Sequence, residues 1–408
     1  MQEIQLRNAK FETLLAKLGE LDSRKFNTVV AATDLRVTDS GLIEVTERIP
    51  GSTDGITSAF EPNDVFIGHV ADTLKIGLPF ARRMFAERPD VASDMVNGLW
   101  HGKTQAHDFE GREWPEPIYP PDSRDFLFRG YTEADGPATA RALLSSKYKV
   151  IDNYDVVTVA LNAIYNSDAK GKITAVNADL TDRRMYVRFV APSVAVNASA
   201  LLEGYRSPFE GGRVERAGDA SALQAVADAA NRWGGDGSTV WAGFELSNSE
   251  VGDGRFKITP RAEFKVCGNG LSIVSDLVAQ THLGARLDQG TINWSQETQK
   301  RQLALVESMT VDAIGDFLSA DYWQRQIDKL AVKGGRTVQD GETVIERVGK
   351  KVGFTDAERK TIFEHFLMGG QHTAAGVMNA VTSTAQTIPN ADRAAEIEAL
   401  AVRALELV

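Results

Sequence analysis

The first hundred residues alternate between helical and extended patterns of apolar positions. Apolar side chains in the first twenty residues recur at spacings close to three and four, which predicts one amphipathic helix that packs on another surface. They are Ile4, Leu6, Phe11, Leu14, Leu15 and Leu18. Two β-rich runs over 27–46 flank Asp39-Ser40-Gly41, which suits a reversing turn, so we expect a hairpin there. Residues 62–100 are predicted to form helices broken at Gly77-Leu78-Pro79 and at Pro89.

The middle of the chain mixes helices with paired strands. The pattern predicts a helix from Gly136 and a second helix over 155–167. A hairpin is expected over 173–192, with its turn beginning at Thr181-Asp182. The middle region is therefore expected to contain both helices and an antiparallel pair.

Helices dominate the later part of the chain. One is expected over 219–232, with Asp219 or Ser221 as its N-terminal cap. Two strands follow, around the glycine-rich turn Gly252-Asp253-Gly254. After about residue 295 the apolar spacing is helical almost throughout.

These patterns predict an α+β fold in which a mixed lobe of antiparallel strands and helices precedes a helical C-terminal lobe. We divide the chain into an N-terminal α/β lobe over 1–130, with a proline-rich linker near 111–125. An α+β core with long hairpins spans 131–294, and the helical lobe spans 295–408. A chain of 408 residues is long enough for two or three such units.

Composition narrows the classes of partner and compartment. The chain has 45 Lys and Arg against 56 Asp and Glu, a net charge of -11, so any nucleic-acid site must be a local patch. Cys267 is the single cysteine, which excludes an intrachain disulfide and suits a reducing compartment. The N-terminus lacks the apolar core of a signal peptide, and no stretch reaches the roughly 18 apolar residues of a membrane span. We expect a cytoplasmic protein that does not enter membranes.

The chain carries none of the strongest catalytic or cofactor motifs. P-loop, dinucleotide-binding, zinc-protease and serine-hydrolase patterns are all absent, and we assign no cofactor. His365 and His372 are seven residues apart, and Gly369-Gly370 between them is expected to end the helix that carries the first. We therefore expect structural histidines and assign no metal.

The strand after Thr181-Asp182 combines arginines with aromatic residues. Side chains alternate along a strand, so Arg184, Tyr186 and Arg188 share one face, while Met185, Val187 and Phe189 share the other. With Arg183, the basic face can hold a single strand through charge and base stacking. The alternative is a solvated outer face of the sheet.

Several short segments resemble a family of phage- and plasmid-encoded proteins that carry a domain of unknown function. The likeness covers roughly 140–390 and lies in an N-S-E-x-G turn, a C-x-N-G-L strand end, a downstream histidine, a late N-A-x-T segment and the stretch before the second predicted helix. The matching residues are Asn248, Ser249, Glu250 and Gly252; Cys267, Asn269, Gly270 and Leu271; His282; Asn379, Ala380 and Thr382; and Tyr148, Val150 and Asn153.

The resemblance implies a mobile-element origin and a bacterial host cytoplasm, without an established activity. The strand before Cys267 is commonly more basic in relatives, whereas here Arg261 and Lys265 are its only cations. That difference weakens a phosphate-binding role for this strand. The Asn and Gly residues of the turns are expected to serve backbone geometry or to line a cleft.

Three hypotheses for the function remain open. The first is a phage accessory protein that binds or anneals single-stranded nucleic acid as a homo-oligomer, using Arg183, Arg184, Tyr186 and Arg188. The second is an enzyme of unrecognised class whose pocket joins the residues Cys267, His282, Glu250 and Asn269. The third is a structural protein that self-assembles through its terminal helices.

Overall fold

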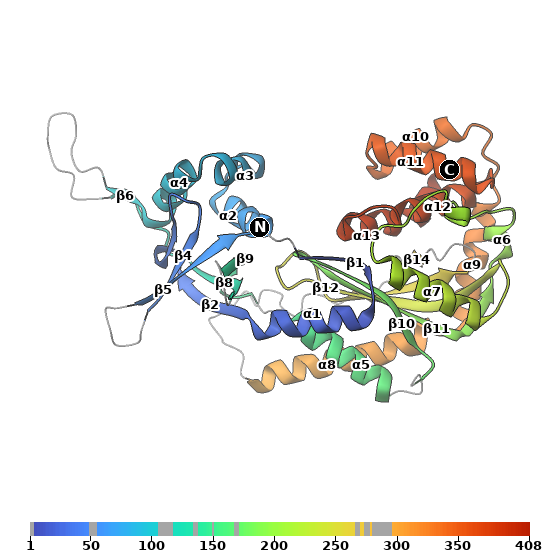
Figure 1. Cartoon of the computed structure of the whole chain (residues 1–408), viewed down its shortest axis with the longest axis horizontal. Coiled ribbons are helices and arrows are strands. Elements are labelled where there is room, and N and C mark those ends of the chain that lie inside the picture. Colours follow the sequence, from blue (N-terminus) through green and yellow to red (C-terminus); the bar gives the residue numbers. More distant parts are fainter. Residues whose placement is uncertain are drawn as a thin grey trace.

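The computed structural model describes residues 4–48, 55–104, 117–133, 138–148, 151–166, 171–265, 270–272, 278–279 and 296–408. These segments form two lobes, each built around its own sheet, which lie side by side in Figure 1 with the lobe that holds α2, α3 and α4 on the left. The fold class is α+β, as the sequence predicts.

The first lobe is a six-stranded sheet with helices on one face. Its strand order is β2-β8-β9-β5-β4-β3, and every neighbouring pair is antiparallel except β5 with β9. The strands are β2 (Lys25–Ala31), β3 (Leu35–Val37), β4 (Ile43–Arg48), β5 (Gly55–Pro62), β8 (Asp125–Tyr131) and β9 (Ala138–Ser145). The helices are α2 (Asp64–Leu74), α3 (Leu78–Glu87) and α4 (Pro89–His101). Phe60, Phe66, Trp100 and Phe128 belong to the apolar core between them.

The second lobe is built on a seven-stranded antiparallel sheet. Its path is β1-β10-β11-β12-β13-β14, and β15 also pairs with β13. The strands are β1 (Gln5–Ala9), β10 (Thr174–Thr181), β11 (Met185–Asn197), β12 (Thr239–Asn248), β13 (Lys257–Phe264), β14 (Gly270–Ser272) and β15 (Val278–Ala279). Helices α1 (Phe11–Ser23), α5 (Asn153–Asn166) and α8 (Gln296–Phe317) pack on one face of this sheet (Figure 1).

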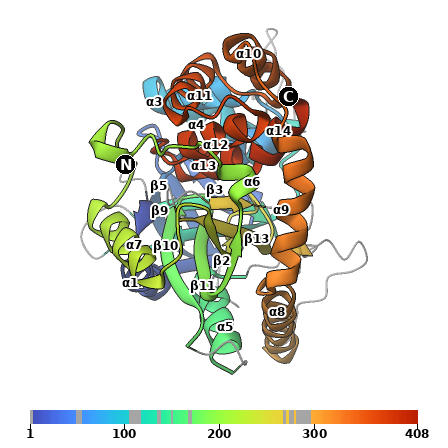
Figure 2. The same ribbon diagram turned by 90° about the vertical axis from the view of Figure 1, so that its right-hand side faces the viewer.

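The opposite face lies under α7 (Ala220–Trp233) and α13 (Ala391–Ala399), as Figures 1 and 2 show. The remaining helices of the second lobe form another apolar core at one end of the sheet, with Val240, Ala242 and Phe264. They are α6 (Ser199–Leu202), α9 (Ala320–Gly334), α10 (Gly341–Val352), α11 (Asp356–Gly369), α12 (Ala374–Ala385) and α14 (Ala401–Leu407). Within the described segments, no helix has the length and apolar composition to cross a membrane.

Most local predictions are confirmed. The turn at Asp39-Ser40-Gly41 joins β3 to β4, and the breaks near Gly77 and Pro89 separate α2, α3 and α4. The hairpins β10–β11 and β12–β13 and helix α5 form where expected. Asp219 caps α7 by accepting hydrogen bonds from the Ser221 and Ala222 amides. The chain is helical over 296–317 and again from Ala320 almost to its end.

One predicted helix begins too early and another is wrong, because strand pairing overrides the local pattern. Gln5–Ala9 is strand β1, which pairs with β10, and the helix begins only at Phe11. Residues from 138 onward form β9, which pairs with β8 and β5 although its alanines and leucines favour a helix. The boundary at residue 130 thus falls inside β8 and divides β8 from its partner β9, and β1 belongs to the second sheet. The predicted linker near 111–125 lies partly outside the described residues.

Candidate functional site

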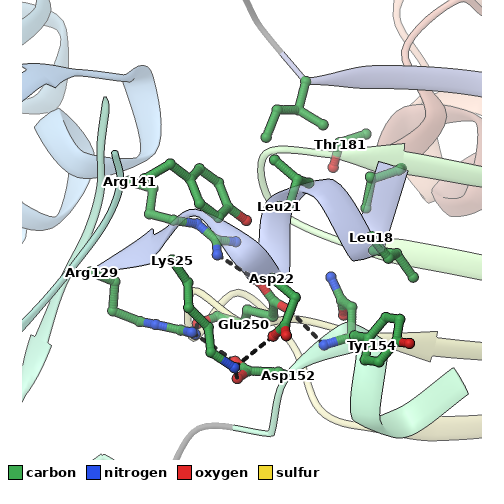
Figure 3. Close-up of a pocket in the computed structure, with 14 residues that line it drawn as sticks. Leu18, Leu21, Asp22, Lys25, Arg129, Arg141, Asp152, Tyr154, Thr181 and Glu250 are labelled. Atoms are coloured by element: carbon green, nitrogen blue, oxygen red, sulfur yellow. Dashed lines mark hydrogen bonds and ion pairs between the residues drawn. The ribbon is translucent and has the colours of Figure 1, made fainter. Parts of the chain in front are cut away.

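The turn between β12 and β13 reaches from the second lobe into the first. Glu250 in this turn accepts a hydrogen bond from Arg141 Nη1 of β9 at 2.6 Å and from the Asn153 amide of α5 at 2.5 Å (Figure 3). Arg129 Nη1 of β8 donates to the backbone oxygen of Glu250 at 2.6 Å. The Arg129, Arg141 and Glu250 side chains are all largely buried. We call this set of contacts the lobe clasp.

A second acid completes the lobe clasp. Asp152 pairs with Arg129 at 2.7 Å and with Lys25 at 3.0 Å. Asn248 donates from Nδ2 to the Ile151 backbone oxygen and to Asn153 Oδ1, both at 2.9 Å. The cavity among these groups is only about 20 Å³, which leaves room for about one water molecule. The charges satisfy one another, so the clasp holds the lobes together and has no space for a substrate.

The rest of the same turn packs against the first lobe. Val251 is fully buried in a small apolar cluster with Ala142 and Leu144. Gly252 has a φ of +79°, and a Cβ there would lie 3.1 Å from the Leu144 side chain. A side chain at this position would therefore be strained and crowded. The N-S-E-x-G segment accordingly has a structural role, with Glu250 as its charged contact.

Of the four residues expected to form a catalytic pocket, the structure places one. Glu250 lies in the lobe clasp, where Arg141 and the Asn153 amide occupy its carboxylate. Cys267, Asn269 and His282 lie outside the described residues. The late N-A-x-T segment is in α12, where Asn379 is buried and donates to the Leu201 carbonyl and to Gln371. That segment helps to pack the helical end of the second lobe.

The basic strand β11 alternates as predicted, but both of its faces are covered. Met185, Val187 and Phe189 enter the core with α1, α5 and α8. Tyr186 is buried on the other face, where its hydroxyl donates to Asp392 of α13 at 3.0 Å, and Arg188 is buried beside it. This face of the strand forms neither an open basic groove nor a solvated outer surface, because α13 lies over it.

The two arginines of the β10–β11 turn lie closer to the surface and have acidic or carbonyl partners. Arg183 bonds to Asp253 and lies 3.4 Å from Asp64 of α2. Arg184 Nε donates to the Asp253 backbone oxygen at 2.6 Å. Burial lowers the pKa of Arg184, but Tyr186 and acidic neighbours outweigh this effect, so the pKa is raised. The structure therefore separates the four predicted nucleic-acid-binding residues, two buried in the second lobe and two at the junction with the first.

Buried charges cross the sheet beneath α13, and we call them the sheet-face network. Asp179 contacts Arg7 at 3.0 Å and Arg188 at 2.7 Å. Arg188 Nε also lies 2.9 Å from Glu245, an ionic contact without hydrogen-bond alignment. Arg261 pairs with Glu263 on its own strand and, at 3.0 Å, with Glu398 of α13.

Burial and neighbouring charges set the pKa values in the sheet-face network. Burial opposes the ionisation of Asp179, but Arg188 and Arg7 outweigh it and lower the pKa of Asp179 to about 2. Burial has the larger effect at Glu245 and Glu263, and it raises the pKa of both carboxyls. The sequence patterns did not predict this network. The signal that could have indicated it is the presence of charged residues inside otherwise apolar strands.

A pocket of about 420 Å³ lies between α7 and the charged face of the sheet. The apolar side of α7 supplies Val226, Ala230 and Trp233, which pack with Trp241 of β12. The two indole rings meet edge to face with centroids 5.0 Å apart. A third ring, Phe209, also lines the pocket. We call this the α7 pocket, and its size is typical of small-molecule sites.

Cations stand beside these rings. The Arg216 guanidinium lies 4.0 Å from the centre of the Phe209 ring. Lys265 Nζ donates to the Gly234 and Gly235 carbonyls at 2.8 and 2.6 Å, just past the end of α7. The acids Glu210 and Glu263 also line the pocket. The α7 pocket thus combines partly open aromatic rings with charges of both signs.

Compared with known proteins, the chain matches no family model, no curated protein and no solved structure. In the part of the chain that the structure describes, no group of three or more His, Cys, Asp or Glu side chains is placed to hold a metal ion. The α7 pocket is the candidate functional site because it offers volume, stacking surface and charge together. The sequence signal for it was the cap at Asp219 followed by a helix that ends at Trp233.

Proposed function

We propose that this chain is a phage- or plasmid-type accessory protein of the bacterial cytoplasm that binds single-stranded nucleic acid. The α7 pocket, rather than strand β11, receives one base with its phosphate. The observation that carries the proposal is the pairing of aromatic rings with two cations in one concavity.

Stacking supplies the first half of the interaction. Trp233 and Phe209 are only partly buried, so each keeps ring surface that a base can meet. Stacking of one base on an aromatic side chain is worth about 1 to 3 kcal/mol and tolerates any sequence. An unpaired base can enter such a pocket, whereas a base inside a duplex cannot reach it.

Phosphate contacts supply the second half. An ammonium group carries three N–H donors, and Lys265 uses two of them on backbone carbonyls. Lys265 and Arg216 are therefore the cations that a phosphate beside the bound base would meet. Since the chain has a net charge of -11, binding must rest on this local arrangement and weaken steeply with salt.

The other two hypotheses have less support from the described residues. Glu250 is engaged in the lobe clasp, which removes the acid from the proposed Cys–His–Glu pocket. The C-terminal helices pack into the second lobe through their apolar faces, which reduces the surface they offer to self-assembly. We also propose that the protein acts as a homo-oligomer, because one nucleic-acid strand offers binding sites to many copies of the chain. Light scattering with and without oligonucleotide tests that part.

Fluorescence anisotropy of labelled single-stranded and duplex oligonucleotides at two salt concentrations tests the proposal. We expect the single strand to bind more tightly, and Trp233→Leu to weaken it by about tenfold while keeping apolar packing in the pocket. Lys265→Gln and Arg216→Gln are each expected to reduce the slope of log affinity against log salt by about 1.

Matched controls lie on α3 in the first lobe. Phe80→Leu removes an exposed aromatic ring and Arg83→Gln removes an exposed cation, both far along the chain from the α7 pocket. These controls should bind like the unchanged protein. Absence of binding at micromolar protein and low salt, or equal losses in the control variants, would refute the proposed function.

A further inference from the structure

We propose that the α7 pocket selects bases that carry an exocyclic amino group, with Glu263 as the residue that accepts a hydrogen bond from it. This inference rests on the proposed function and names the ligand chemistry of the same site. Its basis is the charge of the protein wall on which the base would rest.

The sheet-face network beneath the pocket has more acids than bases. Its three guanidiniums face four carboxylates across β1, β10, β11, β12, β13 and α13. The members are Arg7, Arg188 and Arg261 with Asp179, Glu245, Glu263 and Glu398. Of these seven residues, Glu263 is the one that lines the α7 pocket. The sheet-face network therefore meets the pocket through the Glu263 carboxyl.

Glu263 is held in place by the protein but is incompletely compensated. Its side chain is 5% exposed, and Arg261 is its ion-pair partner. That same guanidinium also pairs with Glu398. Burial raises the pKa of Glu263. A hydrogen-bond donor that arrives in the pocket would stabilise the ionised carboxylate.

This arrangement decides which edge of a base fits. The 4-amino group of cytosine or the 6-amino group of adenine donates a hydrogen bond, whereas uracil and thymine present a carbonyl oxygen at the corresponding place. A carboxylate accepts from the amino group and repels the carbonyl oxygen. Asn177, whose Oδ1 accepts from Arg188 at 3.1 Å, lines the same pocket and offers its amide N–H groups to acceptor atoms of the base. Arg216 and Lys265 line the same pocket and are the cations that the phosphate would meet.

The test compares labelled oligo(dC) with oligo(dU) of equal length, a pair that lacks any methyl difference. We expect the unchanged protein to bind oligo(dC) about tenfold more tightly, the discrimination typical of one good base-edge contact. Glu263→Gln should bring the ratio close to one, because an amide can both donate and accept. The comparison on the unchanged protein does not depend on how well this variant folds.

Glu245→Gln is the matched control, since it removes another carboxylate of the sheet-face network that does not line the pocket. It should keep the preference for oligo(dC). Equal affinity of the unchanged protein for the two oligonucleotides refutes the inference and leaves the proposed function standing. Failure to bind either oligonucleotide refutes both. A ratio that falls equally in Glu245→Gln and Glu263→Gln assigns the preference to overall charge and overturns the role of Glu263.

Discussion

The Glu250 carboxylate bonds Arg141 of the first lobe and the Asn153 amide of the second, so its removal should loosen one lobe from the other. Glu250→Ala removes the hydrogen-bonded ion-pair partner of the buried Arg141 guanidinium, which keeps its contact with the Tyr131 ring, at 4.4 Å, and the attraction of the Asp152 charge. Leaving one member of a buried ion pair uncompensated costs about 3 to 5 kcal/mol. The backbone donor at Asn153 also loses its acceptor, which adds roughly 1 kcal/mol.

We therefore expect Glu250→Ala to lower the free energy of unfolding by about 4 kcal/mol, a large part of the 5 to 15 kcal/mol typical of a folded protein. Urea unfolding followed by tryptophan fluorescence and by far-ultraviolet circular dichroism measures it. Tryptophans are buried in both lobes, Trp100 in the first and Trp241 and Trp323 in the second. Because both probes report on both lobes, loss of the lobe clasp should turn one unfolding transition into two.

Two further measurements isolate the contact itself. Hydrogen exchange at the Asn153 amide should accelerate in Glu250→Ala, because that N–H donates to the removed carboxylate. The double variant Arg141→Met/Glu250→Leu should lower the free energy of unfolding by less than the sum of the two single variants. The difference should be at least about 2 kcal/mol, because neither charge stays buried alone. A change in unfolding free energy below about 1 kcal/mol with unaltered exchange would show that the lobe clasp does not hold the lobes.

Three more outcomes follow from the caps and the buried titrating groups. Asp219→Ala removes the N-terminal cap of α7 and should cost about 1 kcal/mol in thermal unfolding and weaken oligonucleotide binding; unchanged melting would contradict the role of the cap. The pKa of Asp179 is about 2 when folded, so its stabilisation, about 2 kcal/mol, is full at neutral pH and is lost as the pH falls from about 5 to 2. Asp179→Asn should flatten that part of the stability curve measured by urea unfolding. Burial lowers the pKa of His365 to about 4 while its Nδ1 lies 2.9 Å from Ser383 Oγ, so stability should fall as the pH drops from about 6.5 towards 4, and His365→Gln should remove that slope.

Several parts of the fold were predictable because their signals are local. The Asp39-Ser40-Gly41 turn, the breaks at Gly77 and Pro89 and the cap at Asp219 each depend on a few adjacent residues. The alternation of Tyr186 and Arg188 with their apolar neighbours depends only on the two-residue period of a strand. Such features follow from backbone geometry whatever the rest of the chain does.

The candidate site was not predictable in the same way. The apolar period across residues 4–18 fits a helix, yet Gln5–Ala9 pairs with β10, more than 160 positions later. Glu250 meets Arg141 across 109 positions, and Tyr186 meets Asp392 across 206. Nothing in the local pattern distinguishes a basic strand face open to solvent from one covered by α13.

The sequence by itself therefore determined the α+β class, the main hairpins and helices, and which side chains share a strand face. Tertiary structure alone decided that β1 joins the second sheet, that Arg188 is neutralised by Asp179 and Glu245, and that an aromatic pocket opens under α7. The physical reason is range. Turn and helix preferences act over a few residues, whereas burial and charge pairing depend on segments brought together only when the whole chain packs.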